Sequence, residues 1–129
     1  MNVSVLGASA KPDRYSYMAV KMLAGQGHVV LPVHPTLGEI DGIRVFKRLA
    51  DIPLSVHTVT VYLAPERSTP LAGEILAARP RRVIFNPGAE NEELARTLRG
   101  ADIATLEACT LVLIRTGQFD GAGLNGAGP

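Results

Sequence analysis

The first seventeen residues, MNVSVLGASAKPDRYSY (residues 1–17), contain the feature that decides the fold. An apolar run, Val3–Leu6, ends at Gly7, and a polar stretch follows before the next apolar pattern begins. A strand that leads into a glycine turn and then a helix is typical of a phosphate-binding βα unit. The dinucleotide fingerprint of such a unit reads GxGxxG, whereas this chain reads GxSxxP, with Ser9 and Pro12 at the later glycine positions. The loop therefore predicts an anion site but does not by itself name the ligand.

Strand and helix patterns alternate along the rest of the chain. Strands are predicted at 3–6, 29–33, 58–63, 82–86 and 103–107, and helices at 16–26, 65–79 and 89–99. Residues 36–51 are less regular, and the type of the element at 108–115 stays open. The alternation predicts an α/β fold, a doubly wound Rossmann-like parallel sheet of about five strands flanked by helices. We expect one domain over residues 1–119 and a flexible Gly-rich tail over 120–129.

Composition narrows the class of protein. The chain has 129 residues, 47% of them hydrophobic, with a formal net charge of +1, which argues against a nucleic-acid surface. No apolar run reaches membrane-span length, and the start lacks a basic region followed by an apolar stretch, so we expect neither a membrane partner nor a signal peptide. The single cysteine fits a reducing compartment, so we expect a cytoplasmic protein.

Ligands of such sheets bind beyond the carboxyl ends of the strands, so the residues that follow each strand are the candidates. Pro35, Pro65 and Pro87 lie close to three of these ends and could form a rim suited to adenine or another flat group. Each of them could equally serve only to end its strand.

The first loop offers several groups to an anion. The Ser9 hydroxyl can donate to a phosphate, Lys11 and Arg14 add positive charge, and Ser16 or Asp13 is the expected N-cap of the helix that follows. The alternative is an ordinary βα turn with solvated basic residues.

The sequence at the end of the second strand argues against a nicotinamide dinucleotide as the ligand. NAD-binding domains place an acid there for the ribose hydroxyls, whereas this chain reads PVHPT and its nearest acid is Glu39. A nucleotide with a phosphorylated ribose fits a strand end without an acid better, because it has fewer free ribose hydroxyls to bind.

The segments GASAKPDRYSYMAVKMLAGQGHVVLPVHP, LADIP, VTVYLAP and VIFNPGAEN together resemble the small single-domain CoA-binding proteins. These are Rossmann-like and similar to the CoA-binding domain of the succinyl-CoA synthetase alpha subunit. The resemblance runs from about residue 2 to residue 119. With the basic residue Lys11 of the first loop, it implies a CoA or acyl-CoA site built from Gly7, Ala8, Ser9, Lys11, Arg14, Ser16, Val33, His34, Pro35, Pro65, Asn86, Pro87 and Gly88.

Two departures from the family pattern concern the ligand. The family often has Asn where this chain has His34, and no basic residue stands at 36–38 to meet the CoA 3′-phosphate. The ligase chemistry of the synthetases also needs a phosphorylated His in a second domain and a nucleotide-grasp subunit, and this chain contains neither.

The remaining reactive residues predict no catalysis. His28 and His57 are expected to be structural, no metal-ligand spacing is evident, and Arg82 is expected on a solvated face with its neighbours Arg79 and Arg81. Cys109 is either a thiol beside the ligand or a small buried side chain.

The leading prediction is a module that binds CoA or an acyl-CoA without independent catalysis, with a homodimer or partner subunit possible. The alternatives are a nucleotide-binding enzyme of the NAD type, a partial acyl-CoA ligase that needs a partner chain, and a regulatory or scaffold protein that uses the fold without a ligand.

Overall fold

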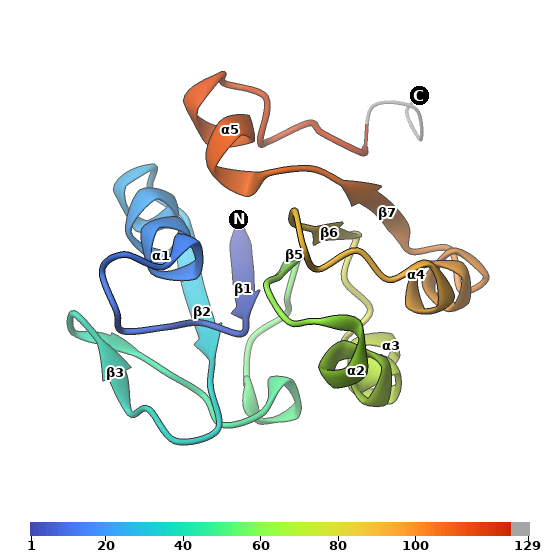
Figure 1. Cartoon of the computed structure of the whole chain (residues 1–129), viewed down its shortest axis with the longest axis horizontal. Helices are drawn as coiled ribbons and strands as arrows, with labels where there is room; N and C mark the ends of the chain where they lie inside the picture. The colour runs from blue at the N-terminus through green and yellow to red at the C-terminus, as the bar shows by residue number, and fades with distance from the viewer. Residues whose placement is uncertain (125–129) are drawn as a thin grey trace.

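The fold is a parallel sheet with helices on both faces, and the computed structural model describes residues 1–124 (Figure 1). The sheet contains β1 (Asn2–Leu6), β2 (Val29–Val33), β5 (Thr58–Val61), β6 (Arg82–Phe85) and β7 (Ala104–Glu107). A separate hairpin is formed by β3 (Glu39–Ile40) and β4 (Ile43–Arg44). The helices are α1 (Tyr15–Gly25), α2 (Pro65–Ser68), α3 (Ala72–Ala78), α4 (Glu92–Arg99) and α5 (Thr110–Arg115), with 3-10 turns η1 (Leu49–Asp51) and η2 (Thr69–Leu71). The predicted fold class is confirmed.

The order of the strands places β1 where the winding reverses. All neighbours are parallel and the order is β2-β1-β5-β6-β7, so the chain leaves β1 toward one edge and later returns on its other side at β5. Phe46 extends the sheet beyond β2, because it forms a parallel bridge with Val33 and exchanges 2.9 Å hydrogen bonds with Pro32 and His34. Counted as a strand of one residue, it completes the order 3-2-1-4-5-6 of dinucleotide-binding domains.

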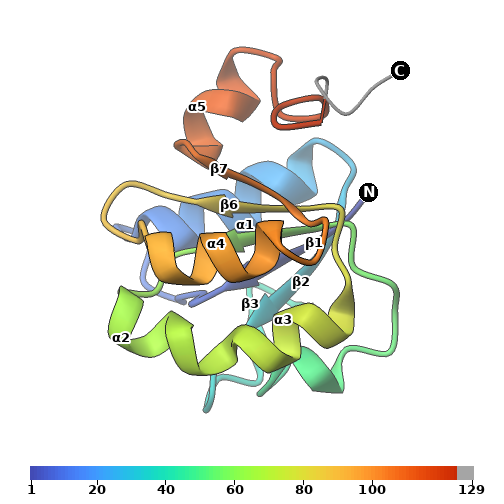
Figure 2. The ribbon, with the colours of Figure 1, turned by 90° about the vertical axis from the view of Figure 1, so that its right-hand side faces the viewer.

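Helices cover both faces of the sheet, which explains why most residues of β1, β2, β5 and β6 are buried. On β6, Val83 and Phe85 pack in the core cluster that includes residues of α3 and α4, whereas Ile84 packs with residues of α1 and α5. Figure 2 shows α2, α3 and α4 on the opposite side of the sheet from α1. Within residues 1–124, no helix is both long enough and apolar enough to cross a bilayer.

Proline divides the helix that the sequence predicts over 65–79. The chain forms α2, then the 3-10 turn η2, which contains Pro70, and then α3. Proline has no N–H to donate and its ring crowds the preceding turn, so the α-helical hydrogen bonds are interrupted there. The element left open at 108–115 is the helix α5, which starts at Thr110.

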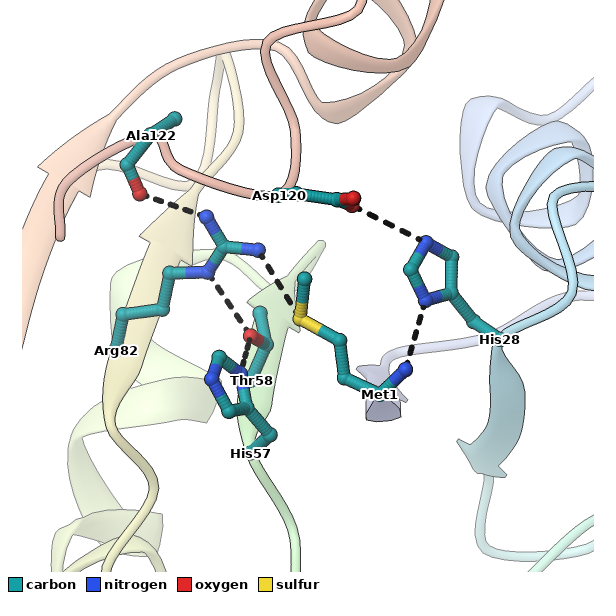
Figure 3. A network of polar contacts seen from close by, with 7 residues as sticks. All are labelled: Met1, His28, His57, Thr58, Arg82, Asp120 and Ala122. Carbon is teal, nitrogen blue, oxygen red and sulfur yellow. Dashed lines mark hydrogen bonds and ion pairs between the residues drawn. The ribbon is translucent and has the colours of Figure 1, made fainter. Parts of the chain in front are cut away.

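Arg82 is fully buried at the amino end of the sheet, so its expected place on a solvated face is wrong (Figure 3). Its guanidinium donates to Thr58 Oγ1 at 2.9 Å and to the carbonyl oxygen of Ala122 at 2.6 Å. It also lies 4.5 Å from the centre of the Phe119 ring. Burial lowers the pKa of Arg82 to about 10. The side chain is covered because the residues after α5 fold back over this end of the sheet.

The first residues of the predicted tail belong to this cover. The Asp120 carboxylate lies 3.6 Å from His28 Nε2, and His28 Nδ1 lies 3.1 Å from the amino group of Met1 (Figure 3). Gly123 approaches Leu106 so closely that a Cβ atom added at Gly123 would lie 2.9 Å from it. Residues 120–124 therefore pack against the sheet, and residues 125–129 lie outside the described part of the chain.

Candidate ligand-binding site

A cavity of about 650 Å³ opens at the carboxyl ends of β1, β2 and β5. One wall is the β1–α1 loop with the first turn of α1, and the opposite wall is formed by residues 47–49 together with side chains from α2, η2 and α3. The cavity thus lies where the strand order reverses, which is the usual ligand position in open α/β sheets. Its volume is within the range of roughly 300–1,000 Å³ typical of small-molecule sites.

The cavity brings together nine of the thirteen residues that the sequence predicts as a binding site. These are Gly7, Ala8, Ser9, Lys11, Arg14, Ser16, Val33, His34 and Pro35. The other four, Pro65, Asn86, Pro87 and Gly88, do not line it. Of the three prolines expected to form a rim, only Pro35 therefore faces the cavity.

Asn86 is engaged in the protein interior. Its side-chain amide donates to Thr60 Oγ1 at 2.7 Å and to the carbonyl oxygen of Val61 at 2.9 Å. Its side-chain oxygen accepts a 2.8 Å hydrogen bond from the N–H of Thr110, the first residue of α5. The buried amide thus links β5 to the start of α5, a connection between distant segments that sequence reading could not foresee.

The backbone of the first loop is used differently from a dinucleotide loop. The N–H groups of Gly7 and Ala8 both donate to the carbonyl oxygen of Val33, at 3.3 and 3.1 Å. Gly7 has a φ of +91°, and a Cβ atom there would lie 2.9 Å from Leu63 Cδ2. Glycine at this position therefore makes room for a leucine side chain, and the two amide groups already have an acceptor.

The start of α1 faces the cavity without a side-chain cap. Its N-cap is Arg14 rather than the predicted Ser16 or Asp13, and among the described residues no side-chain cap hydrogen bond is formed at this end of the helix. The Ser9 hydroxyl is taken up locally, because it accepts a 3.1 Å hydrogen bond from the N–H of Lys11. The open helix N-terminus, with the positive end of the helix dipole, can therefore receive an anion.

His34 has a defined orientation at the end of β2. Its Nδ1 accepts hydrogen bonds from the N–H groups of Thr36 and Leu37, both at 3.1 Å. An Nδ1 atom that accepts has no proton, so the neutral ring carries its proton on Nε2. The side chain can thus offer a donor to a ligand.

Positive charge surrounds the cavity on both walls. Besides Lys11 and Arg14, it is lined by Lys47, Arg48 and Arg67, against a single carboxylate, Glu74. The chain as a whole has a net charge of only +1, so the charge is concentrated at this site. Sequence reasoning missed Lys47, Arg48 and Arg67 because it looked for a basic residue only at 36–38. The available signal for the first two was the Lys-Arg pair directly after the short strand-like run at 43–46.

Two tyrosines of the cavity also escaped sequence reasoning. Tyr15, at the start of α1, is 67% exposed, which is unusual for a large aromatic side chain. Tyr62 follows β5, and its hydroxyl is buried without a hydrogen-bond partner among residues 1–124. Burial raises the pKa of Tyr62 to about 12, although the side chains of Thr110 and Thr60 beside the hydroxyl lower it, so the hydroxyl keeps its proton.

Residues considered for other chemistry lie elsewhere. Cys109 is half-buried after β7 and does not line the cavity. In the part of the chain that the structure describes, no three His, Cys, Asp or Glu side chains gather closely enough to hold a metal ion.

Comparison with known proteins identifies the family and the fold of this chain. Residues 1–115 match the protein family described as CoA binding domain. The uncharacterized protein YneT of Bacillus subtilis (strain 168) is 30% identical over 97 residues, which span 75% of this chain and 72% of YneT. A crystal structure of an uncharacterized protein has 37% sequence identity and a TM-score of 0.86, covering 92% of this chain and 97% of that one.

The same fold occurs within a larger enzyme. The dinucleotide-forming acetyl-coenzyme A synthetase 1 of Ca. Korarchaeum cryptofilum, solved with phosphate and ADP, matches with 21% identity and a TM-score of 0.70. The match covers 81% of this chain and 25% of the synthetase, and at that identity it shows the fold alone. The family match over residues 1–115 confirms the resemblance stated from the sequence: the chain belongs to the CoA binding domain family.

Proposed function

We propose that the protein binds coenzyme A or an acyl-CoA in the cavity at the carboxyl ends of β1, β2 and β5. The observation that supports this most is the convergence of nine predicted residues and an uncapped helix N-terminus on one cavity of about 650 Å³. The CoA diphosphate would lie at the start of α1, where Lys11 and Arg14 can neutralise it. The adenosine would lie along Val33, His34 and Pro35 at the end of β2.

The donors of the site suit this ligand better than they suit NAD. A glycine-rich dinucleotide loop offers backbone N–H groups to the diphosphate, whereas those of Gly7 and Ala8 are already bonded to Val33. In our proposal the diphosphate is held instead by the helix N-terminus and by side-chain cations. The lack of an acid lining the cavity near β2 removes the usual partner of free ribose hydroxyls.

The apolar part of the site can accept the pantetheine arm. Leu63 and Leu71 line the cavity beside the ring of Tyr62. Apolar lining of this kind suits the aliphatic parts of a bound small molecule. We therefore place the pantetheine arm along this wall.

The groups around the cavity favour binding over catalysis. His34 Nδ1 is occupied by two backbone donors, so the ring is held as a donor rather than as a free base. The only carboxylate that lines the cavity among residues 1–124, Glu74, lies 3.4 Å from Arg48 and also accepts from the N–H of Ala50 at 3.2 Å. With its acid and its imidazole both engaged, the site fits a module that holds or senses a CoA thioester.

Isothermal titration calorimetry tests the proposal directly. Wild-type protein should release saturable heat with CoA and acetyl-CoA and should bind NAD much more weakly. Ser9→Tyr fills the loop side of the cavity and should abolish binding, whereas Ser55→Tyr is a matched change of an exposed serine outside the cavity. Circular dichroism confirms that both variants are folded. No heat with CoA at millimolar concentration would contradict the proposed function.

A further inference from the structure

We propose that Lys47 and Arg67 form a separate subsite for a phosphate on the ribose, so that the cavity selects CoA over dephospho-CoA. The inference rests on the proposed function and adds the partner of the 3′-phosphate, for which the segment at 36–38 offers no cation.

The cations of the cavity form two groups that come from different parts of the chain. Lys11 and Arg14 belong to the β1–α1 loop. Lys47 precedes η1, and Arg67 belongs to α2, so this second group lies on the wall opposite the loop. A ligand with a single anionic centre at the helix N-terminus would leave the second group without a counter-charge.

The second group also lacks a counter-charge from the protein. In the described part of the chain, the only ion pair of the cavity joins Arg48 to Glu74, at 3.4 Å. Neither Lys47 nor Arg67 lies within 4.0 Å of a carboxylate in residues 1–124. Like charges that converge on a cavity whose one lining carboxylate, Glu74, is already paired with Arg48 raise the potential of the cavity and attract an anion.

The backbone places Lys47 beside the expected position of the ribose. Phe46, which immediately precedes Lys47, exchanges hydrogen bonds with Pro32 and His34 at the carboxyl end of β2. In dinucleotide-binding domains an acid at this end binds free ribose hydroxyls, whereas a nearby cation accommodates a ribose phosphate. Here the nearest acid, Glu39, is exposed on the hairpin, accepts from the N–H of Gly42 and does not line the cavity. The position therefore favours a phosphomonoester on the adenosine ribose.

The primary test compares two ligands on the wild-type protein, so it does not depend on the folding of any variant. Titration calorimetry should give CoA at least about tenfold higher affinity than dephospho-CoA, as expected for charge-assisted hydrogen bonds to one phosphate. The affinity for adenosine 3′,5′-bisphosphate should exceed the affinity for AMP by a similar factor. Equal affinities for CoA and dephospho-CoA would overturn the inference and leave the proposed function standing, whereas failure of both ligands to bind would overturn both.

Variants assign the selectivity to particular residues. Lys47→Ala and Arg67→Ala should lower the ratio of the CoA affinity to the dephospho-CoA affinity toward one, whereas Lys11→Ala on the opposite wall should weaken both ligands alike. Arg96→Ala, an exposed residue of α4 outside the cavity, removes the same charge and should change neither affinity. A ratio that survives the loss of both Lys47 and Arg67 would overturn the assignment. If the protein prefers NADP over NAD but does not prefer CoA over dephospho-CoA, the assignment of Lys47 and Arg67 to a 3′-phosphate is wrong.

Discussion

Replacing Gly7 by alanine tests what the glycine of the first loop is for. A dinucleotide loop needs glycine so that a phosphate can approach the backbone. Here the residue has a φ of +91°, and an added Cβ atom would lie 2.9 Å from Leu63 Cδ2 and 3.3 Å from the backbone carbon of Tyr62. The structure therefore predicts a loss of stability in the absence of any ligand.

The magnitude has two parts. A left-handed backbone costs a residue with a side chain about 1–2 kcal/mol, and overpacking a filled site costs about 1–3 kcal/mol, which gives about 2–5 kcal/mol for Gly7→Ala. For a chain of this size the melting temperature should fall by roughly 6 to 25 °C. Gly27 is the matched control, because its φ is +86° and an added Cβ atom would meet nothing within 4 Å. Gly27→Ala should therefore lose only the backbone part, about 1–2 kcal/mol.

Urea unfolding of the ligand-free protein, followed by circular dichroism, measures both losses. Adding Leu63→Ala to Gly7→Ala removes the side chain in the way, so the double variant should lose at least about 1 kcal/mol less than the sum of the single losses. Equal losses at Gly7 and Gly27, together with additive behaviour of the double variant, would refute the steric reasoning.

Three further predictions concern Asn86, Tyr62 and the pair His28 and His57. Asn86→Ala should destabilise the fold by about 2–4 kcal/mol in urea unfolding, because it leaves buried groups without partners. The CoA affinity of the folded protein should stay unchanged. A stable variant that has lost CoA binding would show that Asn86 contacts the ligand instead. Tyr62→Phe should not lower the melting temperature, because the buried hydroxyl that it removes has no hydrogen-bond partner among residues 1–124; a clear fall in melting temperature would show that the hydroxyl bonds to Thr60 or Thr110 beside it. Burial is the main cause that lowers the pKa of His28 and that of His57, so the unfolded chain takes up protons before the folded one as the pH falls. Stability should therefore be full above about pH 6.5 and should decline as the pH drops through the lower folded values. Melting temperatures across this range should fall less steeply in the variant with both His28→Gln and His57→Gln, and an equal slope would count against this origin.

The fold and nine of the residues that line the cavity could be predicted from local patterns. The carboxyl ends of parallel strands meet at one edge of a sheet, so the loop after β1 and the PVHP segment after β2 had to lie close together. Lys47 escaped prediction because a basic residue was sought only at 36–38, and no local pattern shows that the single bridge at Phe46 brings the next residue to the cavity. The role of Asn86 escaped prediction because its partner, the N–H of Thr110, is 24 residues away.

Arg82 shows the same limit at the other end of the sheet. A basic residue that directly follows Arg79, Pro80 and Arg81 is typical of a solvated face, and nothing in its local sequence indicates that it will be covered. The cover comes from Phe119 and Ala122, in a Gly-rich segment without helix or strand periodicity. Local patterns predict elements, whereas the burial of Arg82 depends on the path of a distant segment that has no pattern.

In the proposed function, a chain whose first loop departs from the GxGxxG fingerprint would hold its anion by other groups. In the GxGxxG design, selectivity for a diphosphate comes from the backbone, which changes little with sequence. Here two backbone donors are committed to Val33, so the anion is left to the end of α1 and to side chains that sequence change can easily replace. A site of this kind recognises its ligand through the number and spacing of its charges. CoA, with a diphosphate and a separate phosphomonoester, matches two groups of cations on opposite walls, whereas NAD offers a charge for only one of them.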